Sequence, residues 1–261
     1  MSVKRFMLAA VTSGMLLSSA DAAVLEPIQS DMRDYEAIRT TATGALSTSN
    51  GIGGDNRIGN RQTTTMSSSI LGFALPALAA GDVAAATLSI TFEGESASLR
   101  AEAGDGNIDL YGLPFDPADV FTQDASRYYS GPSDATTGVT KLQDNIFTVA
   151  EYPAEGTTVN KVSVDISDYV NSLYAAGAVE GDFAVLRLSY DLDLNNSNNR
   201  FRVVTSGGDG STVGTVDPPT GSPHTIAEGA PFLSITTVPE PGSMAVLGLG
   251  ALGLIRRRRT A

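Results

Sequence analysis

The stretch Thr87-Leu-Ser-Ile-Thr-Phe-Glu93 decides the fold class of this 261-residue chain. Leu88, Ile90 and Phe92 alternate with polar residues, so an extended backbone would place the three apolar side chains on one face. That period of two is typical of a half-buried β-strand, whereas a helix would need a period near 3.6. The same alternation recurs in other parts of the chain.

Alternation or short apolar runs between Gly, Asn, Asp and Pro turns predict further strands. They fall at residues 34–40, 57–59, 69–75, 108–111, 145–149, 162–166, 186–194, 200–204 and 232–236. Pro76 is expected to end the strand at 69–75. In the 186–194 segment the predicted outer, polar face carries Arg187, Ser189, Asp191 and Asp193.

One short helix is expected between residues 167 and 177. Ser167 or Asp168 can cap its start and Gly177 can end it. Its apolar stripe consists of Tyr169, Val170, Leu173 and Tyr174. The predicted fold is all-β, an antiparallel β-sandwich of jelly-roll-like form with one short helix. Residues 42–54 and 207–229, poor in large apolar side chains, are predicted to be mobile loops.

The two ends of the chain differ from the body. Lys4 and Arg5 precede an apolar run at 6–17 and the string Ser18-Ser-Ala-Asp-Ala-Ala23, the pattern of a secretory signal peptide cut after Ala22 or Ala23. The predicted organisation is a signal peptide at 1–23, a sandwich body at 24–237 and a C-terminal tail at 238–261.

Composition narrows the function of the body. The ends hold six of the 17 basic residues and two of the 29 acidic ones, so the body is more acidic than the whole chain's net −12. A strongly acidic body argues against nucleic acid as a partner. Cysteine is absent, which excludes thiol catalysis and thiolate metal sites. The one histidine, His224, lies in a loop rich in Pro and Gly, a poor scaffold for a catalytic base.

The tail combines three signals: Val238-Pro239-Glu240-Pro241, an apolar run at 244–255, and Arg256, Arg257, Arg258 and Arg259. The apolar run is shorter than the roughly 20 residues of a stable membrane span, and the arginines favour the cytoplasmic side. We expect a marginal, transient anchor that forms an apolar helix in the inner membrane. The tail closely resembles PEP-CTERM sorting signals of Gram-negative bacteria. The resemblance implies export, an exosortase as processing partner near the Pro-Glu-Pro string, and a destination on the cell surface or in the extracellular matrix.

A second resemblance rests on the order of segments in the body. They are Asp34-Tyr-Glu-Ala-Ile-Arg39, Arg57-Ile-Gly-Asn60, Gly72-Phe-Ala-Leu-Pro76, Ala86-Thr-Leu-Ser-Ile90, Val164-Asp-Ile-Ser-Asp-Tyr-Val170, Phe183-Ala-Val-Leu-Arg-Leu188 and Pro231-Phe-Leu-Ser-Ile235. This order resembles DNRLRE-type β-sandwiches, bacterial surface modules similar to carbohydrate-binding modules. The resemblance implies the sandwich fold and, as an expectation, contact with carbohydrate.

Two groups of side chains are candidates for ligand binding. Asp191, Asp193 and Asn195 are candidate calcium ligands because calcium prefers carboxylate and amide oxygens, although the spacing is not that of an EF-hand. The alternative is a solvated strand face that runs into an Asn-rich turn. Asp105-Gly-Asn-Ile-Asp109 is a second stretch of this kind. No other cofactor is expected.

Tyr128 and Tyr129 lie in a long polar segment of a chain without tryptophan. Exposed tyrosines can stack on sugar rings, so the pair is the candidate carbohydrate platform; the alternative is that one tyrosine closes the end of the core. No spacing of carboxylates singles out the acid and nucleophile of a glycosidase.

The sequence predicts an exported, non-enzymatic surface protein that contacts polysaccharide in a biofilm. Two alternatives remain open: a structural or adhesive surface protein that binds another protein, and a glycan hydrolase or lyase. An exposed flat edge strand would favour the first alternative. Two buried, convergent carboxylates in a cleft would favour the second.

Overall fold

The computed structural model describes residues 23–25, 28–29, 35–40, 45–50, 55–62, 65–94, 107–117, 139–190, 200–204 and 231–238. Val24–Val238 forms one compact unit. The described elements are β1 (Ile28–Gln29), β2 (Tyr35–Thr40), β3 (Leu46–Asn50), β4 (Asp55–Gln62), β5 (Thr65–Ala74), β6 (Val83–Glu93), β7 (Ile108–Gly112), β8 (Thr140–Phe147), η1 (Val149–Glu151), β9 (Thr158–Asp165), α2 (Ser167–Ala175), β10 (Phe183–Tyr190), β11 (Arg200–Val204) and β12 (Phe232–Thr237).

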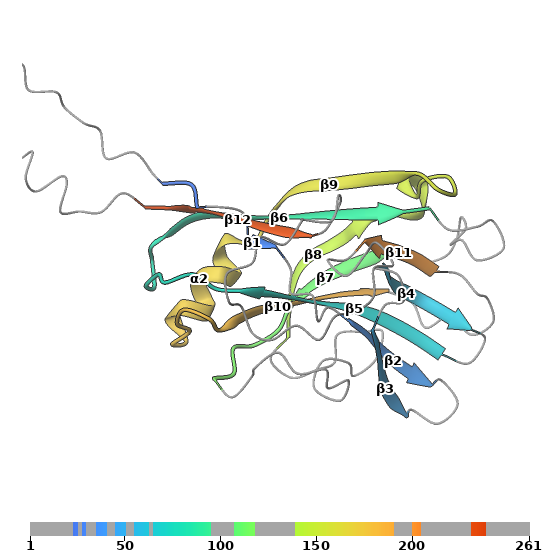
Figure 1. Cartoon of the computed structure of the whole chain (residues 1–261), viewed down its shortest axis with the longest axis horizontal. Helices are drawn as coiled ribbons and strands as arrows, with labels where there is room; N and C mark the ends of the chain where they lie inside the picture. The colour runs from blue at the N-terminus through green and yellow to red at the C-terminus, as the bar shows by residue number, and fades with distance from the viewer. Residues whose placement is uncertain are drawn as a thin grey trace, which may run out of the picture. The chain divides into compact units, whose positions relative to one another are not determined.

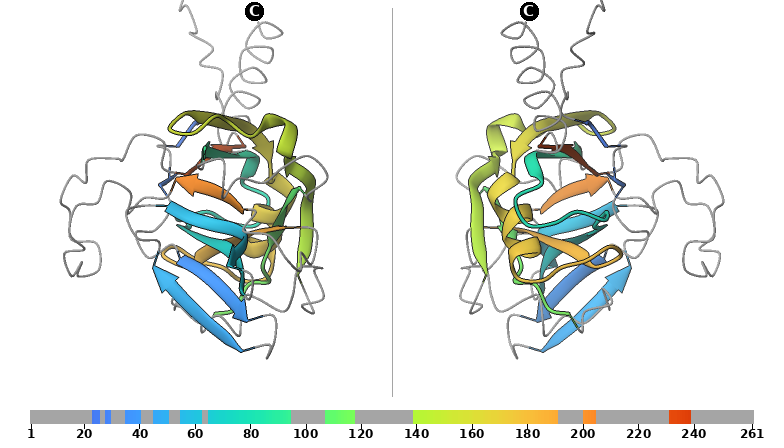
Figure 2. Two further views of the ribbon diagram at one scale, coloured as in Figure 1. Left: turned by 90° about the vertical axis from the view of Figure 1, so that its right-hand side faces the viewer. Right: turned by 90° about the vertical axis from the view of Figure 1, so that its left-hand side faces the viewer.

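The described strands form a single antiparallel sheet of twelve strands that curls into two layers (Figures 1 and 2). Two long strands organise it. β6 pairs with β12, β11 and β9, and β5 pairs with β2, β4 and β10. The strands around β6 form one layer, the β6 layer, and those around β5 form the other, the β5 layer. β11 pairs with β6 and also with β4, a neighbour of β5, and so joins the two layers. The all-β antiparallel fold with one short helix is confirmed.

The core lies between the two layers. Leu88, Ile90 and Phe92 of β6 are fully buried there, as the alternation predicts. Phe92 stacks on Phe147 of β8 with ring centroids 3.9 Å apart, and Phe147 meets Phe201 of β11 edge-on at 5.8 Å. Aromatic side chains from both layers therefore interlock at one end of the core.

Helix α2 covers the other end of the core and differs from expectation only at its start. Its four predicted apolar residues are buried and Gly177, with φ +103°, follows its end. Ser167 is the first helical residue rather than the cap. The carboxylate of Asp165 accepts the Ser167 N–H at 2.9 Å, and the Ser167 hydroxyl donates to the same oxygen. These two hydrogen bonds hold the pKa of Asp165 below its usual value.

The predicted loop at 42–54 is wrong, because β3 (Leu46–Asn50) lies within it and pairs with β2. Large apolar side chains are not needed there, since main-chain hydrogen bonds to β2 hold a strand at the margin of the sheet. The strand predicted at 145–149 is also displaced. β8 runs from Thr140 to Phe147, with exposed polar residues that hide the alternation, and a 3₁₀ turn follows.

No helix within the described ranges is long and apolar enough to cross a membrane. The apolar tail segment predicted to enter the inner membrane, residues 244–255, lies outside those ranges, as does the loop predicted at 207–229.

Candidate functional site: the ends of the body and its buried polar groups

The side chains predicted to bind ligands fall outside the described ranges. This holds for the candidate sugar platform, Tyr128 and Tyr129, and for the candidate calcium ligands, Asp191, Asp193 and Asn195. Of the sorting residues, Val238 is described and those from Pro239 to Arg259 are not. His224 is likewise outside. The structure does show where the segments with the candidate calcium ligands and the candidate sugar platform join the sheet.

The two acidic stretches join the sheet at the same place. Asp191 follows Tyr190, the last residue of β10, and Tyr190 pairs with Ile108, the first residue of β7. The second stretch, residues 105–109, runs into β7 at this same pair. Residues 191 and 107 therefore continue from neighbouring strand ends.

The tyrosine segment joins the sheet at the opposite end of β7. It lies between residue 117 and Val139, next to the pair that Gly112 forms with Thr140 of β8. Four strand steps separate Ile108 from Gly112, roughly 14 Å at 3.4 Å per residue. The attachment points of the candidate sugar platform and the candidate calcium ligands are therefore distinct.

Asp109 is a buried structural anion and not an open calcium ligand. One carboxylate oxygen accepts hydrogen bonds from the Tyr111 hydroxyl at 2.9 Å and from Lys141 Nζ at 2.8 Å. The other accepts from the main-chain N–H of Asn145 at 2.8 Å. Asn145 has a left-handed backbone, φ 52°, at an irregular part of β8. Asp109 thus fastens β8 to β7.

Two cations flank Tyr111 in the same cluster. Strand register places Arg187 of β10, Tyr111 of β7 and Lys141 of β8 side by side. The Arg187 guanidinium lies 4.7 Å from the ring centroid and Lys141 Nζ lies 5.6 Å from it, both within range of cation–π attraction. The hydrogen bond to Asp109 raises the pKa of Lys141 well above its usual value, so this ammonium stays charged.

This cluster lies on the face of the β5 layer that points away from the core, which the sequence predicts to be solvated. The exposed fraction of Arg187 and of Ser189 is 0% instead. A small apolar group made up of Ala37, Ile70, Leu113 and Val185 lies on the same face. The predicted solvent exposure of this face is wrong. Alternation shows which residues share a face of the strand, but it does not show whether other parts of the chain cover the polar face.

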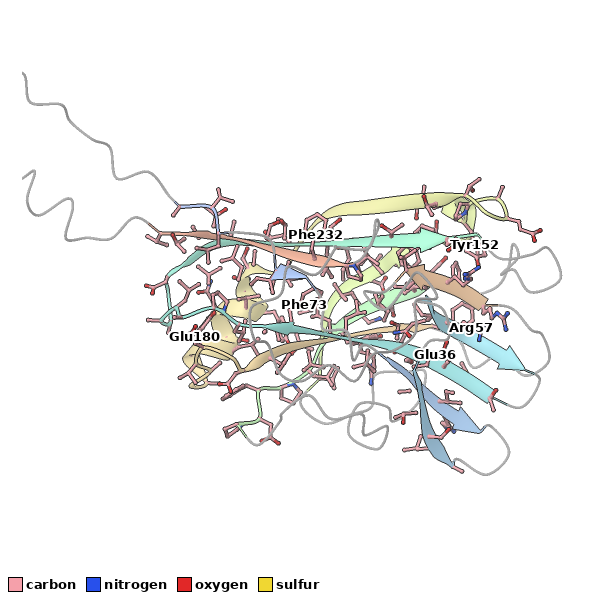
Figure 3. The ribbon with its side chains drawn as sticks, in the orientation of Figure 1. Glu36, Arg57, Phe73, Tyr152, Glu180 and Phe232 are labelled. Atoms are coloured by element: carbon pink, nitrogen blue, oxygen red, sulfur yellow. The ribbon has the colours of Figure 1, made fainter. Side chains whose placement is uncertain are left out.

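Glu36 is the other buried carboxylate of the described residues. It accepts the main-chain N–H of Arg57 at 2.8 Å, and Figure 3 shows the two residues close together where β2 approaches β4. Asn56 donates to the Ser69 hydroxyl at 2.9 Å in the same region. Sequence reasoning missed this group, since its members look like ordinary surface positions of predicted strands.

Glu36 and Asp109 lie on opposite faces of one sheet. Residues that pair directly across antiparallel strands share a face. Glu36 pairs with Ser69, Ser69 with Leu188 and Leu188 with Leu110, so Glu36 is on the face of the core residue Leu110. Asp109, next to Leu110 along β7, is on the other face. The sheet itself separates the two carboxylates.

The body begins and ends at neighbouring positions. Val24 forms a bridge with Thr236, and the Leu25 N–H donates to the Ile235 carbonyl at 2.9 Å. The N–H of Val238, the last described residue, donates to the Asp82 carbonyl at 2.7 Å. β12 is therefore held up to the point where the tail starts. The described residues contain no cluster of three or more acidic or histidine side chains able to hold a metal ion.

Comparison with known proteins identifies the tail. Residues 237–259 match the model of the PEP-CTERM protein-sorting motif, a range that contains both the Pro-Glu-Pro string and the four arginines. No curated protein matches the chain. The chain thus carries an exosortase sorting signal. It is an exported protein that is anchored in the membrane during sorting and then displayed on the cell surface.

Proposed function

We propose that this exported protein is a non-catalytic component of the biofilm matrix whose sandwich body contacts extracellular polysaccharide. The observation that carries the proposal is the order of elements. The seven body segments that resemble DNRLRE-type sandwiches coincide with β2, β4, β5, β6, the β9–α2 junction, β10 and β12. This agreement supports a module of the kind that displays binding loops on a rigid sheet.

The arrangement of buried carboxylates supports a non-catalytic role. A glycosidase needs two carboxyl groups that flank one sugar linkage, between about 5 and 9.5 Å apart. Glu36 and Asp109 are on opposite faces of the sheet, and each is engaged by donors within the fold. Neither can serve as the partner of the other in hydrolysis.

The binding residues in this proposal are Tyr128 and Tyr129, with calcium bound separately by Asp191, Asp193 and Asn195. The two segments join the sheet beside opposite ends of β7, the calcium segment through Tyr190 of β10, and this supports treating them as two sites. Loss of calcium should therefore leave sugar stacking on the tyrosines largely intact. A single shared site would instead lose both together.

The test is binding of the Val24–Val238 body to a panel of bacterial exopolysaccharides, with and without calcium. The proposal expects saturable binding that falls at least tenfold in a Tyr128→Ala, Tyr129→Ala variant. Phe232→Ala, which removes an exposed aromatic on β12, is the matched control and should bind as the unaltered body does. Absence of binding to every polysaccharide, or equal losses in both variants, would contradict the proposal.

Calcium is tested by calorimetry on the same body. Asp191→Asn with Asp193→Asn should abolish calcium binding, whereas Glu180→Gln, which neutralises an exposed carboxylate in the turn after α2, should not. Heat of binding unchanged by the double substitution would place calcium elsewhere. Cleavage of any polysaccharide in the panel would favour the glycan hydrolase or lyase alternative.

A further inference from the structure

β3 (Leu46–Asn50) is an outer strand of the β5 layer. It pairs with β2 at five consecutive positions without a register shift, and it pairs with no other described strand. Ala45, Leu46 and Ser47 are exposed. Within the described part of the chain, no strand covers the side of β3 away from β2, and an uncovered side of this kind presents main-chain groups to which another strand can add.

The other outer strands of the described sheet carry features that obstruct such pairing. β8 has two register shifts, a left-handed residue at Asn145, and the charged side chains of Lys141 and Asp144. β9 contains a register shift, and β1 is two residues long. Bulges, charges and short length are the means by which proteins block their sheet edges.

β3 has none of these features. Its sequence, Leu46-Ser-Thr-Ser-Asn50, contains no charge, proline or glycine, in a chain with net charge −12. A positively charged partner would need acidic residues on β3 to bind, and β3 has none. β3 is instead suited to pair with another uncharged strand.

We infer that β3 pairs antiparallel with β3 of a second copy of this chain. Centred on Thr48, the pairing puts Thr48 opposite Thr48, Ser47 opposite Ser49 and Leu46 opposite Asn50. Thr and Ser cross-strand pairs stabilise antiparallel strands, and a twofold axis through Thr48 makes both contacts identical. The two β5 layers then form one continuous sheet across the dimer.

The contact between the two β3 strands is small, and its size determines the protein concentration at which the dimer forms. A five-residue strand pair falls well below the roughly 1,000 Å² that a stable soluble dimer needs. Association is therefore weak for dilute protein and strong where copies are concentrated on a surface, as for a displayed protein. Because both copies are acidic, added salt screens their repulsion and strengthens the contact. This inference is independent of polysaccharide binding.

The test uses the absence of cysteine from the chain. Thr48→Cys places one thiol on the twofold axis, where paired Cα atoms 4.5 to 5.5 Å apart can form a disulfide. Thr140→Cys, on the obstructed strand β8, is the matched control. In the Val24–Val238 body under mild oxidation, Thr48→Cys should form disulfide dimers at least tenfold faster, and faster still in high salt. Equal rates for the two variants, or a rate that falls with salt, would overturn the inference.

A second measurement needs no cysteine. Sedimentation of the unaltered body should show an average mass that rises toward the dimer as concentration approaches the millimolar range. Ser47→Lys should remain monomeric, because in this register the two lysines would lie diagonally across the axis on the same face and repel each other, while Thr140→Lys should behave as the unaltered body does. Thermal unfolding checks that both variants are folded. A monomer at every concentration, or dimers unaffected by Ser47→Lys, would exclude pairing through β3.

Discussion

Gly112→Ala should destabilise the body by displacing helix α2. Gly112 is not among the glycines with a left-handed backbone, so alanine is compatible with its conformation. The obstacle is Tyr169: an added Cβ would lie 2.5 Å from Cε2 and 2.6 Å from Cδ2 of its ring. Carbon atoms need roughly 3.5 Å or more, so the ring must move by about 1 Å.

That movement also affects the Tyr169 hydroxyl. Its single proton can be donated to the Val185 carbonyl at 2.8 Å or to the Leu113 carbonyl at 3.0 Å, and Tyr169 is buried. Overpacking costs about 1–3 kcal/mol, and loss of a buried hydrogen bond about 1 kcal/mol. The gain from restricting the unfolded chain offsets roughly 0.5 kcal/mol. The expected net loss is about 1.5–3.5 kcal/mol, a fall in Tm of roughly 3–14 °C for a body of this size.

A double-mutant cycle by urea unfolding separates the two causes. Tyr169→Phe alone should cost about 1–2 kcal/mol. In the Gly112→Ala background it should cost less than half as much, because the hydroxyl has already left its acceptors. Tyr174→Phe is the control, since that hydroxyl donates to the Pro76 carbonyl from five residues further along α2. Its effect should add to that of Gly112→Ala within about 0.5 kcal/mol.

Two results would refute this reasoning. If Gly112→Ala unfolds within 0.5 kcal/mol of the unaltered body, the ring is not held against the strand as described. If Tyr169→Phe costs the same in both backgrounds, the methyl group is accommodated by the strand and not by the helix.

Three further predictions follow from other contacts. Gly94→Ala should cost at least about 3 kcal/mol in urea unfolding, because its Cβ would collide with the main-chain oxygen of Ala154 and the backbone can yield little; a smaller loss would contradict the close approach. Lys141→Met should cost about 1–3 kcal/mol, because it removes a charged donor from buried Asp109, whereas Lys141→Arg should lose less. Burial first, and the charge of Asp82 second, raise the pKa of Tyr174 to about 12. The unfolded chain therefore loses this proton first, so stability should fall as pH rises from 10 to 12, and Tyr174→Phe should flatten that fall in urea midpoints.

Much of the fold could be predicted because local alternation and core burial agree. In β6 and β5 each apolar residue that alternates is also a core residue, so a period of two identifies both strand and face. Helix α2 could be predicted equally well, because the four residues of its apolar stripe all pack into the core between the layers. β3 was missed for the opposite reason. Its stability comes from main-chain pairing at the edge, which leaves no apolar pattern.

The polar clusters could not be predicted from local pattern. Asp109 and Lys141 are 32 residues apart, and Glu36 reaches the backbone of Arg57 from 21 residues away. Only strand register brings them together, and register is a property of the whole sheet. The predicted ligand residues differ from these clusters. Tyr128 and Asp191 are candidates because of the chemistry of their side chains, and they lie outside the described ranges. Their roles stay predictions.

The sorting tail and the fold meet at β12, and this determines how the anchored protein bears load. The matched motif begins at residue 237, the last position of β12. A pull on the tail is therefore transmitted first to β12, which is paired with β6 over its length and with β1 at its start. Force along a strand strains these hydrogen bonds together and not one after another. Processing near Pro239-Glu-Pro241 would cut just beyond the last main-chain contact among the described residues, that of Val238 with Asp82, and so would leave the described sheet whole.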